Sequence, residues 1–300
     1  MTLTTPGTVG ADAAMSGRQQ YDRTRFAAAN VGHLLLPVVV LELIVLYGPT
    51  VAWLIERWTM SVWHHAHGLL IPPLITYFAW IELRPLRRIP TTASPLGFLF
   101  LVPALLLQVL DTGIRTQLLS AISLVISLPG LALLFLGTTR TKAIAFPLGF
   151  SVFMLPIPLA LTEGVQMILR QIAATSATSI VPFLGISIHG DGTMLHLRTG
   201  TLAVTDACSG FSTLYAAIAA AALTAYSCRS TARRIVVLIM AAPIALAANV
   251  VRVVLLVAMV DRYGFGVLST WIHPATGVLT FALALPAIFA LGRTQNEEAR

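Results

Sequence analysis

Long apolar stretches separated by short polar segments dominate the pattern of hydrophobic and polar positions along this 300-residue chain. A helix needs about 20 mostly apolar residues to cross the hydrocarbon core of a bilayer. Runs of this kind predict eight transmembrane helices, at residues 31–48, 66–83, 95–111, 116–137, 143–161, 208–227, 235–260 and 271–292. The pattern therefore predicts an all-α polytopic membrane protein, in which the third and fourth spans are close enough to form one tight hairpin.

Residues 162–206 form the longest segment predicted to lie outside the membrane. Its second half contains ISIHGDGTMLHLRTGTLAV, in which apolar and polar residues alternate around Gly190, Asp191 and Gly192. Alternation of this kind is typical of short strands, and glycine and aspartate favour the turn between them. We expect two or three strands that form a small extracytoplasmic β-flap at about residues 183–206, between the fifth and sixth spans.

The composition excludes a single soluble domain, because 57% of the residues are hydrophobic and only 10% are charged. Cytoplasmic loops of membrane proteins collect Lys and Arg, and placing both termini inside assigns 13 of the 19 such residues to the cytoplasm: Arg18, Arg23, Arg25, Arg84, Arg87, Arg88, Arg140, Lys142, Arg229, Arg233, Arg234, Arg293 and Arg300. This arrangement predicts cytoplasmic tails at 1–29 and 293–300 and one membrane domain at 30–292. The net charge of +7 then reflects topology, and no nucleic-acid partner is predicted.

The two cysteines are predicted to lie at opposite ends of the sixth span. Cys208 stands at its outer mouth and Cys228 at its inner end, about 30 Å away at 1.5 Å per helical residue. A disulfide between them is therefore excluded if the span is helical. Cys228 fits a structural role at a helix end, whereas an outward-facing Cys208 requires a chemical explanation.

Arg252 and His273 are predicted to lie at the same depth as Cys208. Arg252 stands within the seventh span, where a charge is costly and usually faces a partner or a water-filled cavity. His273 begins the eighth span, so the antiparallel order of the last three spans brings all three groups to the outer side. A snorkelling arginine and a packed histidine remain the simpler alternatives.

These three residue types support thiol-dependent acyl transfer. A cysteine is mostly a thiol at neutral pH, so a nearby cation or the N-terminus of a helix is needed to stabilise the thiolate. His273 is suited to accept the thiol proton, and Arg252 to stabilise an oxyanion or bind a substrate carboxylate. Ser209 and Ser212 are weaker candidates, because serine needs a stronger base, and Ser209 fits the start of a helix.

Two further polar features have structural interpretations. Asn249 lies three residues before Arg252 on the same helix face, where it is expected to bind the guanidinium or a neighbouring helix. His64, His65 and His67 lack the spacing of metal ligands. No metal or cofactor is therefore predicted.

The ordered motifs on the last three spans resemble those of the exosortase/archaeosortase family of membrane cysteine enzymes. They are Ala207-Cys208-Ser209-Gly210, Asn249-Val-Val-Arg252, and His273 with Gly277 four residues later. The upstream segments HHAHGLLIPPLITYFAW (64–80) and FPLGFSVFMLPIP (146–158) also resemble this family. The resemblance covers about residues 31–292.

The resemblance implies that Cys208 is a nucleophile that forms a thioester, with Arg252 and His273 completing the catalytic set. It implies membrane-anchored substrates with a short outer motif such as Pro-Glu-Pro, one transmembrane helix and a basic tail. The expected location is the bacterial inner membrane, with the site facing the periplasm or outside and His67 lining it. Arg57, Arg170 and Arg198 are candidates to bind an acidic motif residue, although each fits a solvated surface equally well.

The chain departs from the family pattern after Cys-Ser-Gly. It has Phe211-Ser212-Thr213 where many relatives carry an arginine, and Asp206 where many carry glutamate. A transporter or channel that binds an anion at Arg252 is an alternative function, and a scaffold in an envelope complex is another. The scaffold gives no reason for Cys208, Arg252 and His273 to gather at one depth.

Overall fold

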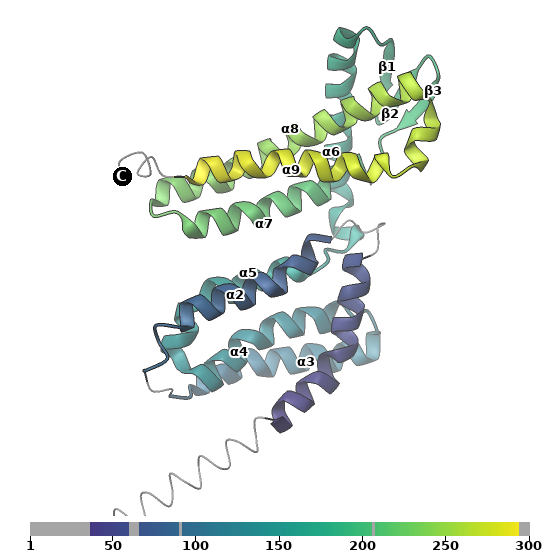
Figure 1. The fold of residues 1–300 in the computed structure, drawn as a ribbon. Helices are drawn as coiled ribbons and strands as arrows, with labels where there is room; N and C mark the ends of the chain where they lie inside the picture. Colours follow the sequence, from purple (N-terminus) through teal and green to yellow (C-terminus); the bar gives the residue numbers. More distant parts are fainter. Residues whose placement is uncertain (1–36, 60–65, 90–91, 206–207, 294–300) are drawn as a thin grey trace, which may run out of the picture. The chain divides into compact units, whose positions relative to one another are not determined.

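The structure is a computed structural model that describes residues 37–59, 66–89, 92–205 and 208–293 (Figure 1). The chain divides into two compact units, Met1–Trp53 and Leu54–Arg300. The described part of the first unit belongs to a helix, Pro37–Thr59, that ends in the second. The predicted tails at 1–29 and 293–300 lie outside the described residues, apart from Arg293.

Helices form most of the second unit, and one small sheet interrupts them. In chain order the elements are η2 Ala66–Leu70, α2 Ile71–Leu83, η3 Pro95–Gly97, α3 Phe98–Ile114, α4 Leu118–Ala143, α5 Ala145–Phe150, η4 Ser151–Met154, α6 Leu159–Ile180, η5 Val181–Leu184, β1 Ile188–Asp191, β2 Met194–Leu197, β3 Gly200–Ala203, α7 Phe211–Ser227, α8 Thr231–Tyr263, η7 Phe265–Ser269 and α9 Ile272–Gly292.

Within the described residues, six helices are long and apolar enough to cross a membrane: Pro37–Thr59, Pro95–Ile114, Leu118–Ala143, Ala160–Leu184, Thr231–Tyr263 and Ile272–Gly292. Ala145–Met154 and Phe211–Ser227 are shorter apolar helices. The predicted run 66–83 divides into η2 and the 13-residue α2. The prediction of a mostly helical, multi-span protein with a small sheet is therefore confirmed, whereas the number of eight spans is not.

The prediction of one span at 143–161 is wrong. α5 and η4 end at Met154, Pro158 has an extended backbone with ψ of 139°, and α6 begins at the next residue. Proline lacks a backbone N–H and disfavours helical backbone in the residue before it. The pair Pro156 and Pro158 therefore ends one helix before the next begins.

Residues 162–180, predicted to lie outside the membrane, form most of helix α6. Glu163, Gln166 and Arg170 interrupt the apolar pattern of this segment, so a count of consecutive apolar residues does not identify it as a helix. These residue types are nonetheless good helix formers. The segment thus continues as a helix as far as η5, and only the part after Leu184 contributes to the sheet.

α3 and α4 form the tight hairpin that their spacing allowed. Asp111, buried near the end of α3, accepts hydrogen bonds from the N–H and hydroxyl of Thr116 (3.0 and 2.6 Å) and of Ser120 (3.2 and 2.5 Å). The first N–H groups of a helix have no partners within it. The carboxylate of one helix therefore caps the next, and Ser123 adds a hydrogen bond to the carbonyl of Ala104 (2.6 Å).

The sheet has the predicted place and size. Its order is β1-β2-β3 with antiparallel pairing, and Asp191 pairs with Met194 across the first turn. That turn is Gly192-Thr193, one position later than the centre of the Gly-Asp-Gly motif, and Gly192 adopts the positive φ of 58° that it needs. Leu195 and Leu197 on β2 are buried.

The last three helices, α7, α8 and α9, pack side by side, and the sheet lies at one end of them (Figure 1). Small residues let the helices approach closely. Their shared core consists of Ala217, Ala221, Ala225, Cys228, Val237, Ala241, Ala245 and Ile288. This packing holds the start of α7 and the start of α9 at the same end of the group.

Removing the Asp111 carboxylate should destabilise the α3–α4 hairpin. Asp111→Ala leaves four donors without this acceptor, and the two on buried Ser120 are expected to cost about 1–3 kcal/mol each if they stay unpaired. We expect a lower midpoint of thermal unfolding for the detergent-solubilised protein. Thr112→Val, which removes an exposed hydroxyl bonded within its own helix, is the control and should leave the midpoint unchanged. An equal midpoint for both variants would contradict the proposed cap.

Candidate active site

Cys208 and His273 are in direct contact. The Sγ of Cys208 lies 3.3 Å from Nε2 of His273, although 65 positions separate the two residues in sequence. Cys208 is 8% exposed and precedes α7, where its N–H donates to the carbonyl of Thr205 (2.9 Å). His273 is the second residue of α9, and its carbonyl accepts the hydroxyl of Thr276 (2.8 Å). The predicted pairing of thiol and imidazole is therefore present in the fold.

Arg252 is the third predicted residue, and it is buried within α8 at 4% exposure. Its guanidinium lies against α9 at Gly277, where a side chain would begin 3.2 Å from Cζ of Arg252. Contacts that close are uncommon, so the glycine provides the space that the guanidinium occupies. The structure thus explains why Gly277 follows His273 by one helical turn.

Burial determines the resting state of the thiol. Desolvation raises the pKa of Cys208 above its usual value, while the positive charge of Arg252 and a hydrogen bond with the Thr205 side chain act in the opposite direction. The net direction is upward, so the cation alone does not maintain a thiolate at neutral pH. The site therefore needs a base for the proton, and His273 is within reach.

Ser209 has the structural role that was favoured for it. It is 1% exposed, and its hydroxyl oxygen accepts the N–H of Phe211 (3.3 Å) at the first residue of α7. Of the two partners expected for Asn249, it binds the neighbouring helix, through the backbone that precedes α7. Its side-chain amide donates to the carbonyls of Cys208 (3.2 Å) and Ser209 (3.1 Å), in the segment that leads into α7.

Other predicted site residues lie elsewhere. The ring of His67 packs edge-on against Tyr215 at 5.0 Å, one turn into α7. Arg198 is exposed just after β2, and Arg57 and Arg170 are half-buried on their helices. His64, His65 and Asp206 lie outside the described residues. Among the residues that the structure describes, no three His, Cys, Asp or Glu side chains are grouped as a metal site.

Thr205 was missed in the sequence. It supports Cys208 through both its carbonyl and its side chain. In the sequence, the only feature that connects Thr205 with Cys208 is that it lies three residues earlier. Threonine is common near turns, so this position alone does not indicate a contact. The contact could not be inferred without the backbone that brings the two residues together.

A family model described as transmembrane exosortase (Exosortase_EpsH) matches residues 58–290. The match covers more than three quarters of the chain and contains Cys208, Arg252 and His273. No curated protein and no solved structure matches the chain.

The influence of Arg252 on the thiol can be measured without a substrate. Because its positive charge lowers the pKa of Cys208, Arg252→Gln should raise that pKa. We expect the rate of iodoacetamide labelling of Cys208 to rise with pH along a curve displaced to higher pH, so that labelling is slower at any given pH below the plateau. The measurement uses membranes and a Cys228→Ser background, so that only one cysteine reacts.

Arg262→Gln is the matched control, because Arg262 lies exposed in the last turn of the same helix. This variant should leave the labelling curve in place. A curve for Arg252→Gln that stays in place or moves to lower pH would show that the guanidinium does not act on the thiol.

Proposed function

The chain belongs to the transmembrane exosortase family, and we propose that it is a membrane-embedded cysteine protease or transpeptidase that cleaves the C-terminal sorting signal of exported proteins. In this proposal Cys208 is the nucleophile, His273 the general base and acid, and Arg252 the electrostatic partner. Membership of the family is the evidence for the processing of sorting signals. The geometry of the site is the evidence for the roles of the three residues.

The contact between Cys208 Sγ and His273 Nε2 carries the proposal. Two polar side chains at the starts of separate apolar helices would gain little from this contact if the protein were only a scaffold. A thiol at 3.3 Å from an imidazole is instead placed for proton transfer. The raised pKa of the thiol makes that transfer necessary for attack.

Acylation follows from these positions. His273 takes the proton of the thiol as Cys208 attacks the scissile carbonyl, and a tetrahedral oxyanion forms. The carbon–nitrogen bond then breaks, and the imidazolium returns the proton to the departing amine. The product is a thioester between Cys208 and the exported part of the substrate.

The thioester is then cleaved by an incoming nucleophile. Water yields a carboxylic acid, whereas an amine acceptor yields a new amide, and in both cases His273 takes the proton of the nucleophile before the thiolate leaves. Arg252 stabilises the negative charge of the tetrahedral intermediate or binds a carboxylate of the substrate. Its burial strengthens either interaction, because little water competes for the guanidinium.

The substrates we propose carry a short outer motif such as Pro-Glu-Pro, one transmembrane helix and a basic cytoplasmic tail. Cleavage takes place on the outer face, and both termini of the enzyme lie in the cytoplasm. Segments assigned to the cytoplasm contact one another in support of this topology. Arg140 donates to the carbonyls of Leu86 (3.2 Å) and Ile89 (2.7 Å), and Arg233 donates to the carbonyl of Arg293 (2.6 Å).

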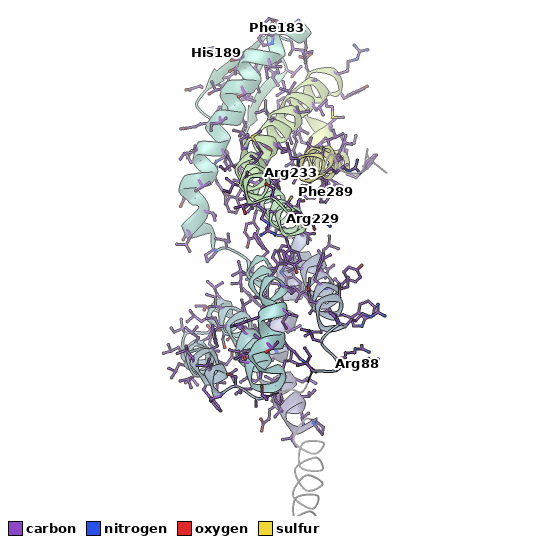
Figure 2. All side chains as sticks on the ribbon, turned by 90° about the vertical axis from the view of Figure 1, so that its left-hand side faces the viewer. Arg88, Phe183, His189, Arg229, Arg233 and Phe289 are labelled. Atoms are coloured by element: carbon purple, nitrogen blue, oxygen red, sulfur yellow. The ribbon has the colours of Figure 1, made fainter. Side chains whose placement is uncertain are left out.

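The two ends of the last three helices carry different residues, which agrees with this topology. Figure 2 looks toward the end that carries Arg229 and Arg233, at the turn between α7 and α8. Arg234 adds a hydrogen bond to the carbonyl of Cys228 (2.9 Å) at this turn. Cys208 and His273 stand at the opposite end, where α7 and α9 begin. An arginine-rich end and a reactive end fit a helix group that presents its chemistry to the outside.

Cleavage should depend on the thiol and the imidazole. A tagged reporter with a Pro-Glu-Pro motif, one transmembrane helix and a basic tail is co-expressed with each variant, and its cleavage is followed by immunoblotting. We expect Cys208→Ala to abolish cleavage and His273→Ala to slow it by about 10²–10⁴-fold, the range for loss of a general acid–base group.

Cys228→Ala is the control, because Cys228 is buried at the far end of α7 and its thiol contacts the carbonyls of Thr224 and Gly292. This variant should cleave the reporter normally. All variants must accumulate in the membrane at similar levels. Normal cleavage by Cys208→Ala would overturn the proposed function, and flux of an anion that requires Arg252 but not Cys208 would favour the transporter.

A further inference from the structure

Asn249 holds the backbone of the nucleophile from a neighbouring helix. The side chain is 1% exposed, and its Nδ2 lies 3.2 Å from the carbonyl oxygen of Cys208 and 3.1 Å from that of Ser209. We propose that Asn249 is a positioning residue, which fixes the Cys208–Ser209 backbone so that the thiol faces His273. This proposal rests on the proposed function, because it gives Asn249 a task only if Cys208 is the nucleophile.

The chemistry of an amide suits this task. The NH2 group of asparagine has two donors, so one side chain is able to satisfy two carbonyls. Both acceptors belong to buried residues, where an unpaired carbonyl would be costly. A valine or leucine at this place in an apolar helix would pack well and leave both carbonyls without these partners.

The two hydrogen bonds of Asn249 constrain the backbone beyond the two carbonyl oxygens that accept them. Peptide groups are planar, so fixing the carbonyls of Cys208 and Ser209 also fixes the orientation of the two peptide planes that follow these residues. The Cα of Cys208 is attached to the first plane, and its thiol must reach an imidazole nitrogen 3.3 Å away. Loss of the two hydrogen bonds would remove this constraint on the backbone that carries the thiol.

Gly210 supplies the other half of the contact. Its φ of 81° lies in the left-handed region that favours glycine. A Cβ at this position would lie 2.3 Å from Cγ of Asn249, which is far inside contact distance. The glycine is therefore required by its own conformation and by the approach of Asn249. This observation connects the Cys-Ser-Gly motif on one helix with the Asn-Val-Val-Arg motif on the next.

One face of α8 then serves the nucleophile twice. Residues three apart lie on the same side of a helix, and from this side of α8 Asn249 reaches the segment before α7 while Arg252 lies against Gly277 of α9. Asn249 sets the position of the Cys208 backbone, and Arg252 supplies the charge that acts on its thiol. A rigid helix is a better support for both functions than a loop would be.

The conservative variant Asn249→Asp tests the proposal. It retains the shape of the side chain, but an ionised carboxylate has no donor and repels the two carbonyls. With the Pro-Glu-Pro reporter in detergent, we expect kcat to fall on the order of 100-fold, the scale of a misplacement of about 1 Å, while KM changes little. Iodoacetamide labelling of Cys208 in the Cys228→Ser background should also be slower, because the thiol loses its base.

The pH dependence gives a signature that a structural role would not produce. Burial raises the pKa of a carboxyl group at this position and the positive charge of Arg252, one turn along α8, lowers it, but in either case the protonated form regains one donor. The activity of N249D relative to the unmodified enzyme should therefore increase as the pH is lowered. Thr280→Val is the control, because Thr280 is also 1% exposed and its hydroxyl bonds the carbonyl of Thr276 within the same helix. That variant should retain kcat and show a flat activity ratio across the same pH range.

The outcomes separate the two proposals. If Cys208→Ala is inactive but N249D keeps the normal kcat and labelling rate per folded molecule, the positioning role is wrong and the proposed function stands. A loss in N249D that is fully explained by less folded protein, with a flat pH ratio, also overturns the positioning role. If Cys208→Ala cleaves the reporter normally, the proposed function itself fails.

Discussion

A polar group buried among apolar helices must find its partner inside the protein, because hydrocarbon offers no hydrogen bonds. This constraint connects distant parts of the described chain. Asp111, buried near the end of one helix, caps the helix that follows. Asn249 does the same for the segment that contains the candidate nucleophile. In each case one polar side chain fixes the geometry between two elements that apolar packing alone would allow to slide.

The same scarcity of water gives the site its chemical character. A thiol that is nearly excluded from solvent holds its proton more tightly, in spite of the nearby guanidinium. Such a cysteine is protected from reaction until a base acts on it, and His273 is the base within reach. In the proposed mechanism, the burial that would make Cys208 a poor nucleophile in isolation is the reason that it needs the imidazole. The thiol of Cys208 is then expected to react only when the imidazole of His273 is aligned to take its proton.

The sequence predicted which candidate residues lie together better than it predicted the number of spans. The order of the last three spans was enough to place Cys208, Arg252 and His273 at one end, because antiparallel neighbours leave few alternatives. It failed between 143 and 180, where paired prolines end a helix inside an apolar run and polar helix formers continue one beyond it. The hydrophobicity of a segment indicates whether it is suited to lipid, but it does not show where a helix begins or ends. The contacts of Thr205 and Asn249 with the Cys208 segment depend on backbone positions that no residue pattern encodes.

Aromatic residues pack around the segment after Cys-Ser-Gly, where the chain departs from the expected family pattern. Phe211 begins the segment Phe211-Ser212-Thr213, in which the family resemblance leads us to expect an arginine, and it stacks on Tyr215 with ring centroids 6.4 Å apart. Tyr215 in turn contacts His67 and Phe153, so the first turns of α7 are lined by aromatic rings. A cation in the first turn of a helix is disfavoured by the helix dipole, and phenylalanine avoids that cost.

The consequence concerns recognition of the substrate. Under the proposed function, a Phe211-Ser212-Thr213 segment without an arginine leaves another element to supply any cation that binds an acidic motif residue. Arg198 lies exposed between β2 and β3, and the leucines of β2 belong to the same buried core as Cys208. Apolar packing therefore maintains the position of this sheet relative to Cys208, and under the proposed function it would hold Arg198 on an element packed beside the nucleophile.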